Sequence, residues 1–461
     1  MTEFTESDRR TLLAACCLAA FITPLMSTMM NLSLTGLGEY FGEGSHNLGY
    51  VNSSYLLASA VFLVPFAKIG DIIGKRRVFP IGNAIIAVAS VIGMLAPDFW
   101  TVVVSRALIG VGSAAVVCMS LSMITDVYPP GMRGMALGMN TTCVYIGLAI
   151  GPVVGGILND SLGWQSLFAI VVPMSVGAIL LMLRFRHEIR PDAGGSLDYK
   201  GSVLYASAIL LAMGGMISLP EVWAVACVVV GVVLVAFFAY SQSRSPNPVL
   251  DVGLFRNRMF AGSCISAFIS YAASYCLAFF MALYLQNLMG FSAMYAGLIM
   301  LAQSLVQVVF TIYFGRMSDR MADPRTLPVI GMAIITVGLS TLVFYTVDTP
   351  LWMVIVTLVL VGFGFSVFST PNTSAIMSSV PREMTAEASA MVSVMRQTGM
   401  LVSMGVAMTL IAVIMGSADN LAMGNHEEFI QVVRTAFSIC TVLGIAGIVL
   451  SMMGRRKHTE G

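Results

Sequence analysis

Charged residues that could pair with one another gather in two short stretches of a very apolar chain. The first, Ala67 to Arg77, reads AKIGDIIGKRR, and a weaker copy, GRMSDRMADPR, begins at Gly315 with Asp319 in the place of Asp71. Glycines at this spacing permit a tight turn and a close approach of helices. The aspartate can cap a helix or pair with a nearby base. Each half of the chain therefore contains one charged turn, of which the first is spaced by two glycines and the second has only Gly315.

Two arginines lie inside apolar runs, where a charge is expensive. Arg106 lies about two turns inside one run, and Arg396 lies near the middle of another. A charge at the centre of a bilayer costs about 2.5–3.5 kcal/mol on insertion scales, so both side chains are expected to face a central cavity. We interpret Arg106 as a substrate or coupling contact, with a structural hydrogen-bonded arginine as the alternative. For Arg396 both interpretations stay open.

Uncharged polar residues inside the apolar runs are further candidates for lining such a cavity. Unpaired polar groups are costly in lipid, so they should face the interior or one another. Taken alone, each is better explained by an interhelical hydrogen bond than by substrate contact. These candidates are Asn31, Asn52, Tyr55, Asn140, Gln303, Gln307 and Asn372.

Carboxylates are absent from the middle of the apolar runs, and this limits the chemistry. Asp126 and Glu387 lie at the ends of their runs, and the 4 histidines lie in connections or in the tail. The eight cysteines lack metal-ligand spacing, and the chain has no nucleophile–base pair and no phosphate-binding loop. We therefore expect no enzyme, no cofactor, no bound metal, no nucleotide-driven pump and no nucleic-acid partner.

The composition indicates the elements that must position these residues. The chain is 57% hydrophobic and 10% charged, against roughly 25% charged residues in ordinary globular domains. A bilayer requires about 20 apolar residues per helical span. We predict an all-α integral membrane protein with fourteen spans, at about 11–35, 49–67, 78–96, 99–124, 134–158, 165–185, 200–219, 222–241, 260–288, 294–314, 326–347, 351–378, 386–416 and 430–453.

The basic residues give the orientation of these spans. Lys and Arg fill the even-numbered connections, whereas the odd-numbered connections contain Asp and Glu but no Lys or Arg. By the positive-inside rule, both termini are then cytoplasmic in a multi-pass protein of the cell membrane.

Two longer connections, 186–200 and 242–259, divide the chain. They bracket the seventh and eighth spans, which we interpret as a pair inserted between two bundles of six. The predicted units are an N-terminal six-helix bundle (1–185), an inserted helix pair with cytoplasmic linkers (186–259) and a C-terminal six-helix bundle (260–461).

Several motifs, in order along the chain, resemble those of the major facilitator superfamily and its fourteen-span drug:proton antiporter branch. AKIGDIIGKRR resembles the loop 2–3 signature, with Ala67 where glycine is usual. SRALIGVGSAA, around Arg106, resembles the span-4 arginine motif, although Ile109 replaces a customary glutamine. GLAIGPVVGG resembles the span-5 antiporter motif. The others are LDYKGSVL, PNPVLDVGLFRNRMF, YLQNLMGFSAMYAG and STPNTSAIMSSVPRE.

The resemblance implies a major facilitator fold, with two six-helix bundles plus two inserted helices, working by alternating access. It implies that Asp71, together with Lys75 and Asp126, latches the cytoplasmic side shut. Arg133, and Asp319 in the second copy of the turn, are the further gating candidates. In the span-5 motif, Gly151, Pro152 and Gly155 are expected to form a hinge at the bundle interface, with ordinary close packing as the alternative.

One position departs from the family pattern. Antiporters of this branch commonly have an aspartate in span 1, in a pattern resembling D-x-T-x-x-N, whereas this chain has Met26 before Thr28 and Asn31. A proton-coupled carrier needs a titrating group in its cavity. In place of the missing aspartate, the proton could be carried by Asp126 or by the substrate itself.

The sequence as a whole predicts a secondary active transporter. The resemblance implies that it exports small amphipathic or toxic compounds, with protons as the coupling ion, and that it is a monomer in the bilayer. The alternative is a carrier for a neutral or anionic metabolite, with Arg106 and Arg396 as anion partners. A membrane sensor that does not transport is disfavoured, because both charged turns are intact.

Overall fold

The computed structural model describes residues 4–42, 45–189, 198–217, 222–245, 248–291, 293–321, 323–415 and 426–453. Every regular element in these ranges is helical. The main helices are α1 (Glu6–Phe41), α2 (Ser45–Ile73), α3 (Lys75–Met94), α4 (Phe99–Val127), α5 (Arg133–Leu162), α6 (Gln165–Ala169), α7 (Val171–Arg184), α8 (Tyr199–Ile217), α9 (Val222–Gln242), α10 (Arg258–Ser274), α11 (Cys276–Leu283), α12 (Ala293–Ser318), α13 (Thr326–Thr341), α14 (Leu351–Ser378), α15 (Thr385–Met415) and α16 (His426–Met453).

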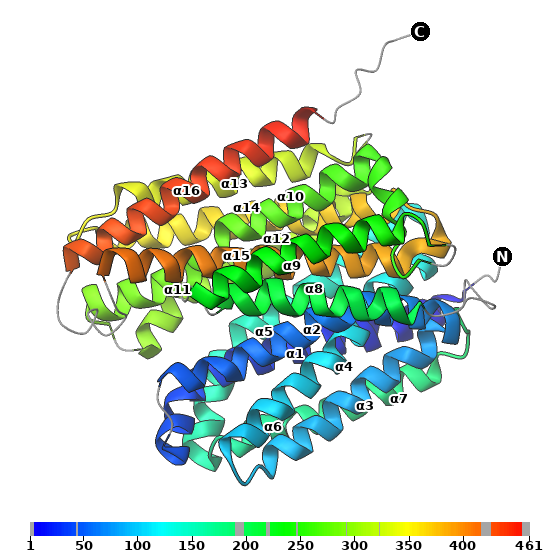
Figure 1. Cartoon of the computed structure of the whole chain (residues 1–461), viewed down its shortest axis with the longest axis horizontal. Helices are drawn as coiled ribbons and strands as arrows, with labels where there is room; N and C mark the ends of the chain where they lie inside the picture. The colour runs from blue at the N-terminus through cyan, green and yellow to red at the C-terminus, as the bar shows by residue number, and fades with distance from the viewer. Residues whose placement is uncertain are drawn as a thin grey trace.

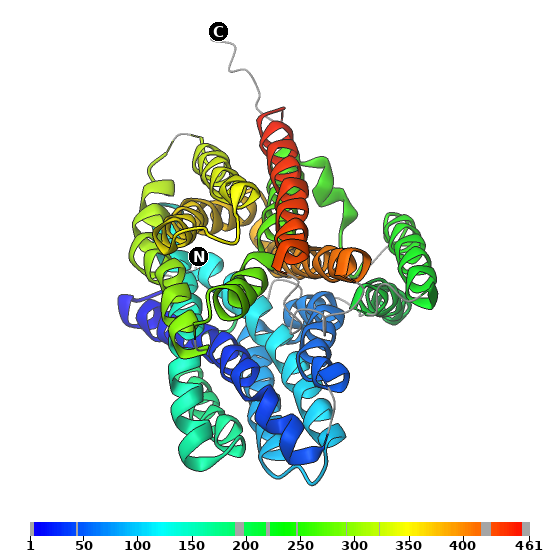
Figure 2. The same cartoon turned by 90° about the vertical axis from the view of Figure 1, so that its left-hand side faces the viewer.

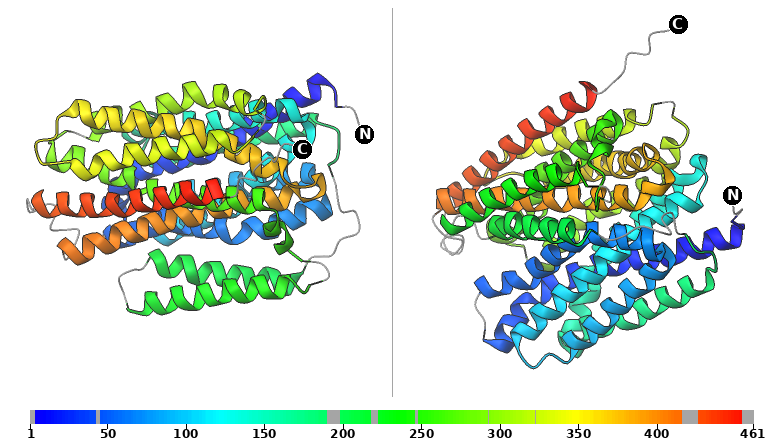
Figure 3. Two further views of the ribbon diagram at one scale, coloured as in Figure 1. Left: turned by 90° about the horizontal axis from the view of Figure 1, so that it is seen from above. Right: turned by 45° about the vertical axis from the view of Figure 1, so that its right-hand side comes forward.

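The predicted spans correspond to these helices in order. Helices α6 and α7 together form the sixth span, while α10, α11 and a π-helical turn at Tyr284–Leu288 form the ninth. Thirteen segments of the described chain are long and apolar enough to cross a membrane. Helix α8 is not one of these segments, although α9 is. The two helices pack along each other and form the separate pair seen in Figure 3.

The helices pack as two bundles with α8 and α9 outside them. In the first bundle α1 packs on α5, and α4 packs on both α2 and α3. In the second, α14 packs on α12 and α13, and α10 packs on α15 and α16. Helix α8 contacts α2 of the first bundle and α15 of the second, and Figure 2 shows the α8–α9 pair to one side of both. The division of the chain into units 1–185, 186–259 and 260–461 stays a prediction.

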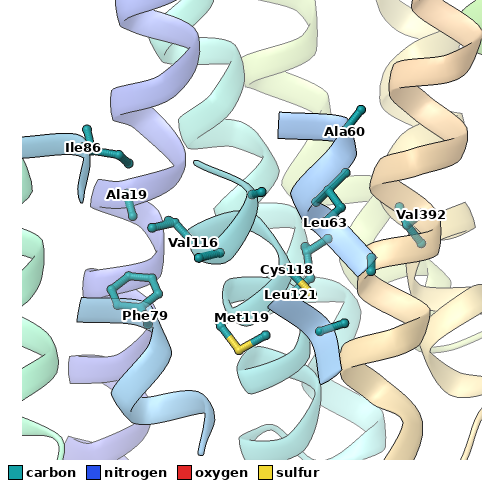
Figure 4. Packing of buried hydrophobic residues seen from close by; sticks show 14 of the residues in the cluster. Ala19, Ala60, Leu63, Phe79, Ile86, Val116, Cys118, Met119, Leu121 and Val392 are labelled. Carbon is teal, nitrogen blue, oxygen red and sulfur yellow. The ribbon is translucent and has the colours of Figure 1, made fainter. Parts of the chain in front are cut away.

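The two bundles are closest at the end of the molecule where the N-terminus lies. In Figure 1 their helices approach each other at this end and separate toward the opposite end. The largest apolar cluster is built mainly from the first bundle but also includes Met391, Val392 and Val394 of α15. Figure 4 shows Val392 in this packing, beside Leu63 of α2. Apolar burial therefore joins the bundles.

Local sequence explains where helices α4 and α3 begin. The Asp98 carboxylate accepts a hydrogen bond of 2.9 Å from the Thr101 N–H and so caps α4. Between α2 and α3, Gly74 has φ of 112°, a conformation that favours glycine. The charged stretch at Ala67 to Arg77 therefore consists of the end of α2, a sharp turn at Gly74 and the start of α3.

Candidate functional site

Lys75, at the start of α3, is the centre of a buried polar cluster. Its side chain is 0% exposed. The Lys75 Nζ donates to Asp126 Oδ2 at 2.8 Å and lies 3.6 Å from Asp71 Oδ1. These are the three residues that the resemblance predicted to form a charge latch, and the structure brings them together.

The cluster reaches across to the second bundle through Thr385, the first residue of α15. Thr385 Oγ1 accepts a hydrogen bond of 2.8 Å from Lys75 Nζ and donates to Asp126 Oδ1 at 3.0 Å. Ser122 Oγ lies 2.9 Å from the same hydroxyl. One threonine therefore connects α3 and α4 of the first bundle to α15 of the second.

Two further hydrogen bonds fasten α15 to α4 beside this cluster. The Cys118 thiol donates to the Ala386 carbonyl at 3.2 Å, and the Ser389 hydroxyl donates to the Cys118 carbonyl at 2.7 Å. On the same turn of α15, the Glu387 carboxylate accepts the Asp251 N–H at 2.9 Å, which docks the connection after α9.

The second charged turn makes the complementary contact. Asp319 follows the end of α12, and its carboxylate accepts hydrogen bonds from the backbone N–H groups of Gly134 (2.8 Å) and Met135 (3.1 Å) at the start of α5. This is an acid at a helix N-terminus, a favourable arrangement. Burial raises the pKa of Asp319, against the lowering effect of these two N–H groups and of nearby Arg133. Arg133 Nε donates to the Tyr128 carbonyl at 3.1 Å.

Helices α5 and α12 touch through glycines at this contact. A methyl group built on Gly134 would lie 2.3 Å from the Gly315 carbonyl oxygen, and one built on Gly315 would lie 2.5 Å from the Gly134 oxygen. Small residues allow such backbone contact between membrane helices. We name the Lys75–Asp126–Thr385 cluster and the Asp319–Gly134–Gly315 contact together the gate.

The glycines of the span-5 motif have a different neighbour from the one expected. A Cβ on Gly147, Gly151 or Gly155 would collide with Phe21, Thr28 or Met29 of α1. Because α1 and α5 belong to the same bundle, these glycines serve close packing within it, and the expectation that they lie between the bundles is wrong. Pro152 lies inside the continuous helix α5. The part of α5 that meets the other bundle contains Gly134 and Gly138 instead.

Arg106 lies in the first bundle on α4 and is 1% exposed. Its guanidinium carbon stands 4.8 Å from the centre of the Tyr55 ring, and its Nε donates to the Val51 carbonyl at 3.2 Å. The Tyr55 hydroxyl lies 3.0 Å from Ser113 Oγ. Stacking on an aromatic face stabilises a desolvated cation. The structure shows the hydrogen-bonded arginine of the structural interpretation, and the substrate or coupling role of Arg106 stays a prediction.

Arg396 has a similar setting in the second bundle. Its guanidinium carbon stands 5.4 Å from the centre of the Tyr271 ring. It lines a small pocket of about 10 Å³, which Asn372, another predicted site residue, also lines. Across the bundle boundary, Tyr145 of α5 interacts with Ser369 and Tyr271 at this pocket. The remaining lining residues are Ala267, Phe368, Thr373 and Val392.

Other predicted polar residues hold helices together. The Asn140 amide donates to the Cys16 carbonyl at 3.1 Å and joins α5 to α1. Gln307 is buried in α12, and Gln303 lies one turn earlier, where its backbone touches Gly362 of α14. The side chains of Asn31 and Asn52 lie outside the part of the chain that the structure describes.

Sequence reasoning missed several residues that the structure places at these sites. Thr385 and Ser122 are hydroxyls at the gate, Tyr271 stacks on Arg396, and the Gln397 amide donates to Ser59 Oγ across the bundles at 3.1 Å. For a serine, threonine or tyrosine in an apolar run, the neighbouring sequence does not indicate which residue of another helix will be its partner. Gln397 could have been found, because it adjoins a predicted site arginine.

No group of His, Cys, Asp and Glu side chains that could hold a metal ion occurs within the described ranges. The acidic residues near the gate (Asp71, Asp126, Asp319 and Glu387) all lie in the first or last turns of helices or just beyond them. The two arginine–tyrosine pairs lie farther from the helix ends, at Arg106 of α4 and Arg396 of α15.

Comparisons with known proteins agree with this architecture. The model of the Major Facilitator Superfamily matches residues 16–257 and 263–461. The riboflavin transporter RibZ of Clostridioides difficile is 27% identical over 369 residues, which cover 79% of this chain and 80% of that protein. The multidrug efflux pump LfrA of Mycolicibacterium smegmatis is 29% identical over 404 residues, covering 85% and 78%.

A third relative, the tetracenomycin C resistance and export protein of Streptomyces glaucescens, is 26% identical and covers 88% of this chain and 76% of its own length. Two solved structures show the same fold at low identity. The human organic anion transporter MFSD10 has a TM-score of 0.69 and 14% identity, covering 96% and 99% of the two chains. The proton:xylose symporter XylE has a TM-score of 0.68 and 15% identity, covering 98% and 96%.

The family match spans both bundles and the inserted pair, and the described helices form the fold of these solved transporters. A multidrug efflux pump and an antibiotic resistance and export protein among the relatives agree with the resemblance to that branch. The chain is therefore a multi-pass membrane transporter, not an enzyme, and it belongs to the major facilitator superfamily.

Proposed function

We propose that this transporter exports small amphipathic or toxic compounds across the cytoplasmic membrane by alternating access, in exchange for protons. The observation that supports this most directly is the gate. Each charged turn contacts the opposite bundle at the same end of the molecule, through Thr385 in one case and Gly134 in the other. A carrier that alternates must make such a contact in one state and break it in the other.

The direction of transport rests on relatives and on charge. Two relatives are named for multidrug efflux and for tetracenomycin C resistance and export. The positive-inside rule places the gate and both termini on the cytoplasmic side. The structure would then correspond to the state in which the cytoplasmic side is closed, and the protein would act as a monomer with the predicted units 1–185, 186–259 and 260–461.

The residues proposed for coupling are the buried carboxylates of the gate. Among these, Asp126 is bonded to both Lys75 and Thr385, so any change in its protonation alters a contact between the bundles. A proton on Asp126 would remove one ionised partner of Lys75 and favour separation. This assigns coupling to the end of the molecule rather than to its centre.

A second candidate function is a carrier for neutral or anionic metabolites. The two arginine–tyrosine pairs favour it, because a buried guanidinium attracts an anion or a carbonyl oxygen and repels a cation. One relative is named a riboflavin transporter. Under either candidate, Arg106, Arg396, Tyr55 and Asn372 are the proposed substrate residues.

Flux measurements in proteoliposomes test both candidates. The purified chain is reconstituted, and the uptake of matched cationic, anionic and neutral dyes is followed with and without an imposed pH gradient. Flux that is unchanged by the gradient would refute proton exchange. Asp126→Asn should abolish the response to the gradient while substrate binding remains. A retained response would show that Asp126 is not the coupling residue. A consistent preference for anions would favour the second candidate.

A further inference from the structure

We infer that helices α8 and α9 and the connection that follows them (residues 248–257) form a clasp that holds the gate shut from outside the bundles, with Gln242 as its joint. Gln242 is the last residue of α9 and is 2% exposed, which is unusual for a glutamine. The inference rests on the proposed alternating access, because it assigns the clasp to the closed state. It goes beyond that proposal by giving a role to two motifs outside the gate, LDYKGSVL and PNPVLDVGLFRNRMF.

One end of the clasp is fastened to the first bundle. The Tyr205 hydroxyl of α8 donates to the Ala60 carbonyl of α2 at 2.9 Å. At the start of the same helix, Asp198 Oδ1 accepts the Gly201 N–H at 2.8 Å and so caps α8. The first motif therefore fixes the start of α8 and leaves the second oxygen of Asp198 to accept a bond from elsewhere.

Gln242 joins α8 to the connection that follows α9. Its Nε2 donates to Asp198 Oδ2 at 3.0 Å, and its Oε1 accepts the Val249 N–H at 2.7 Å. Gly201 leaves room for the first of these bonds, because a Cβ there would collide with both Gln242 Nε2 and Asp198 Oδ2. Both ends of the Gln242 amide are thus bonded. Buried polar groups are almost always paired in this way, so the loss of either partner is costly.

The other end of the clasp is fastened to the second bundle. The Asp251 N–H donates to Glu387 Oε2 of α15 at 2.9 Å. The Asn257 amide donates to the Ser379 carbonyl, at the end of α14, at 2.9 Å. Glu387 lies on the same turn of α15 as Thr385, which belongs to the gate. The second motif therefore fixes the connection to the second bundle at the gate itself.

Opening the gate must stretch or break this path. It moves α2 and α3 away from the start of α15, whereas the hydrogen bonds described above link α2 to α15 through α8 and Gln242. The covalent chain is not the limit, because residues 243–248 can extend to about 20 Å. The bond between Gln242 and Val249 is the joint between the part fastened to the first bundle and the part fastened to the second. Gln242 is therefore a positioning residue that favours the closed state.

Cys118 provides the measurement, because it is 0% exposed and bonded to α15 at the contact of α4 with that helix. A maleimide reaches this thiol only when the two helices part. In the whole chain in nanodiscs, with the other cysteines replaced by alanine, the labelling rate of Cys118 therefore reports the open population. We expect Gln242→Leu to raise this rate about tenfold, the effect of losing one or two buried hydrogen bonds. Ser243→Ala is the matched control, because it deletes a hydrogen bond to the Tyr240 carbonyl within α9, and should leave the rate unchanged.

A reversed hydrogen-bond pair tests the joint a second time. Gln242→Glu keeps the acceptor for Val249 but repels Asp198, so Cys118 should again be labelled faster than in the wild type. Adding Asp198→Asn restores a donor opposite the introduced carboxylate and should return the rate to near the wild-type value. A substitution that only loosened the inserted pair would leave Cys118 protected. A parallel protein in which Cys16 is the single cysteine, also 0% exposed but on α1 within the first bundle, reports unfolding.

Each outcome supports or overturns the inference. An unchanged Cys118 rate in Gln242→Leu refutes it, even where the wild type exports dye and the proposed function stands. A double variant that stays as fast as Gln242→Glu alone also refutes it, and this comparison decides if Gln242→Leu does not fold. If Cys16 is labelled faster in step with Cys118 in every variant, the substitutions unfold the bundle and the inference fails. If only Cys118 is labelled faster but proteoliposomes export no dye, the clasp is supported and the proposed exporter is refuted.

Discussion

Replacing Gly315 with alanine is expected to hold the gate open. A Cβ at this position would stand 2.5 Å from the Gly134 carbonyl oxygen and 3.2 Å from its carbonyl carbon. Both atoms belong to the backbone of α5, so no flexible side chain can move aside. The added methyl group therefore fits only if α12 and α5 separate.

The size of the effect follows from the cost of overpacking. Inserting a methyl group into a well-packed contact costs typically about 1–3 kcal/mol. This cost falls only on the closed state, because the two helices part when the gate opens. Alanine also gains about 1 kcal/mol of helix propensity over glycine, but this gain is common to both states and cancels. The ratio of closed to open molecules should thus fall by about 5- to 150-fold.

Electron–electron distance measurements can follow this shift. Spin labels at Leu183 on α7 and Val449 on α16, both exposed, would report the separation of the two bundles in a background that lacks the native cysteines. Gly297→Ala is the matched control, because Gly297 lies on the same helix and a methyl group there meets no atom within 4 Å. It should leave the distance distribution of the parent unchanged.

The outcome that would refute this reasoning is specific. If Gly315→Ala and Gly297→Ala give the same distance distributions, the glycine contact does not determine whether the bundles can close. A shorter mean distance in Gly315→Ala would contradict the assignment more strongly, because it would mean that the methyl group stabilises the closed state.

Three other changes test the remaining contacts. Lys75→Met leaves the Asp126 carboxylate without its cation. It should destabilise the closed gate by about 3–5 kcal/mol, the cost of breaking a buried pair. Trypsin should then cleave faster at the gate end of the molecule, and cleavage rates equal to those of the wild type would contradict this prediction. Burial raises the pKa of Asp319 in the closed gate, so protonation favours the closed state. The closed population should therefore rise as pH falls through the raised pKa and level off below about pH 3.9. Asp319→Asn should remove this part of the pH dependence, and a pH profile unchanged by the substitution would refute the assignment. Tyr205→Phe deletes a hydrogen bond of 2.9 Å to the Ala60 carbonyl and should lower the midpoint of thermal unfolding by an amount equivalent to about 1 kcal/mol. Tyr199→Phe, at an exposed tyrosine of the same helix, is the control and should leave this midpoint unchanged.

Much of the architecture could be predicted because the bilayer restricts it. The lengths of the apolar runs and the side on which Arg and Lys fall define the spans without any tertiary information. The approach of Lys75 to Asp71 and Asp126 was accessible through the resemblance to the family, which implied a charge cluster at these residues. Contacts between α4, α2 and α3 then follow from the fold.

The residues that sequence reasoning missed belong to long-range packing. The Thr385 hydroxyl is one of many in an apolar helix, and only the approach of α15 to α4 gives it Lys75 and Asp126 as partners. The span-5 glycines illustrate the opposite error. Their i, i+4 spacing shows that some helix must pack closely, but spacing cannot say which helix, and the structure shows α1.

The inserted pair makes the transporter unequal on its two sides. Helices α5 and α12 meet along one seam between the bundles, and α2 and α15 meet along the other. Helix α8 lies against the second seam and is bonded to it through Tyr205. A lipophilic molecule dissolved in the bilayer therefore reaches the α2–α15 seam only after passing α8 and α9. It can reach the α5–α12 seam without passing that pair.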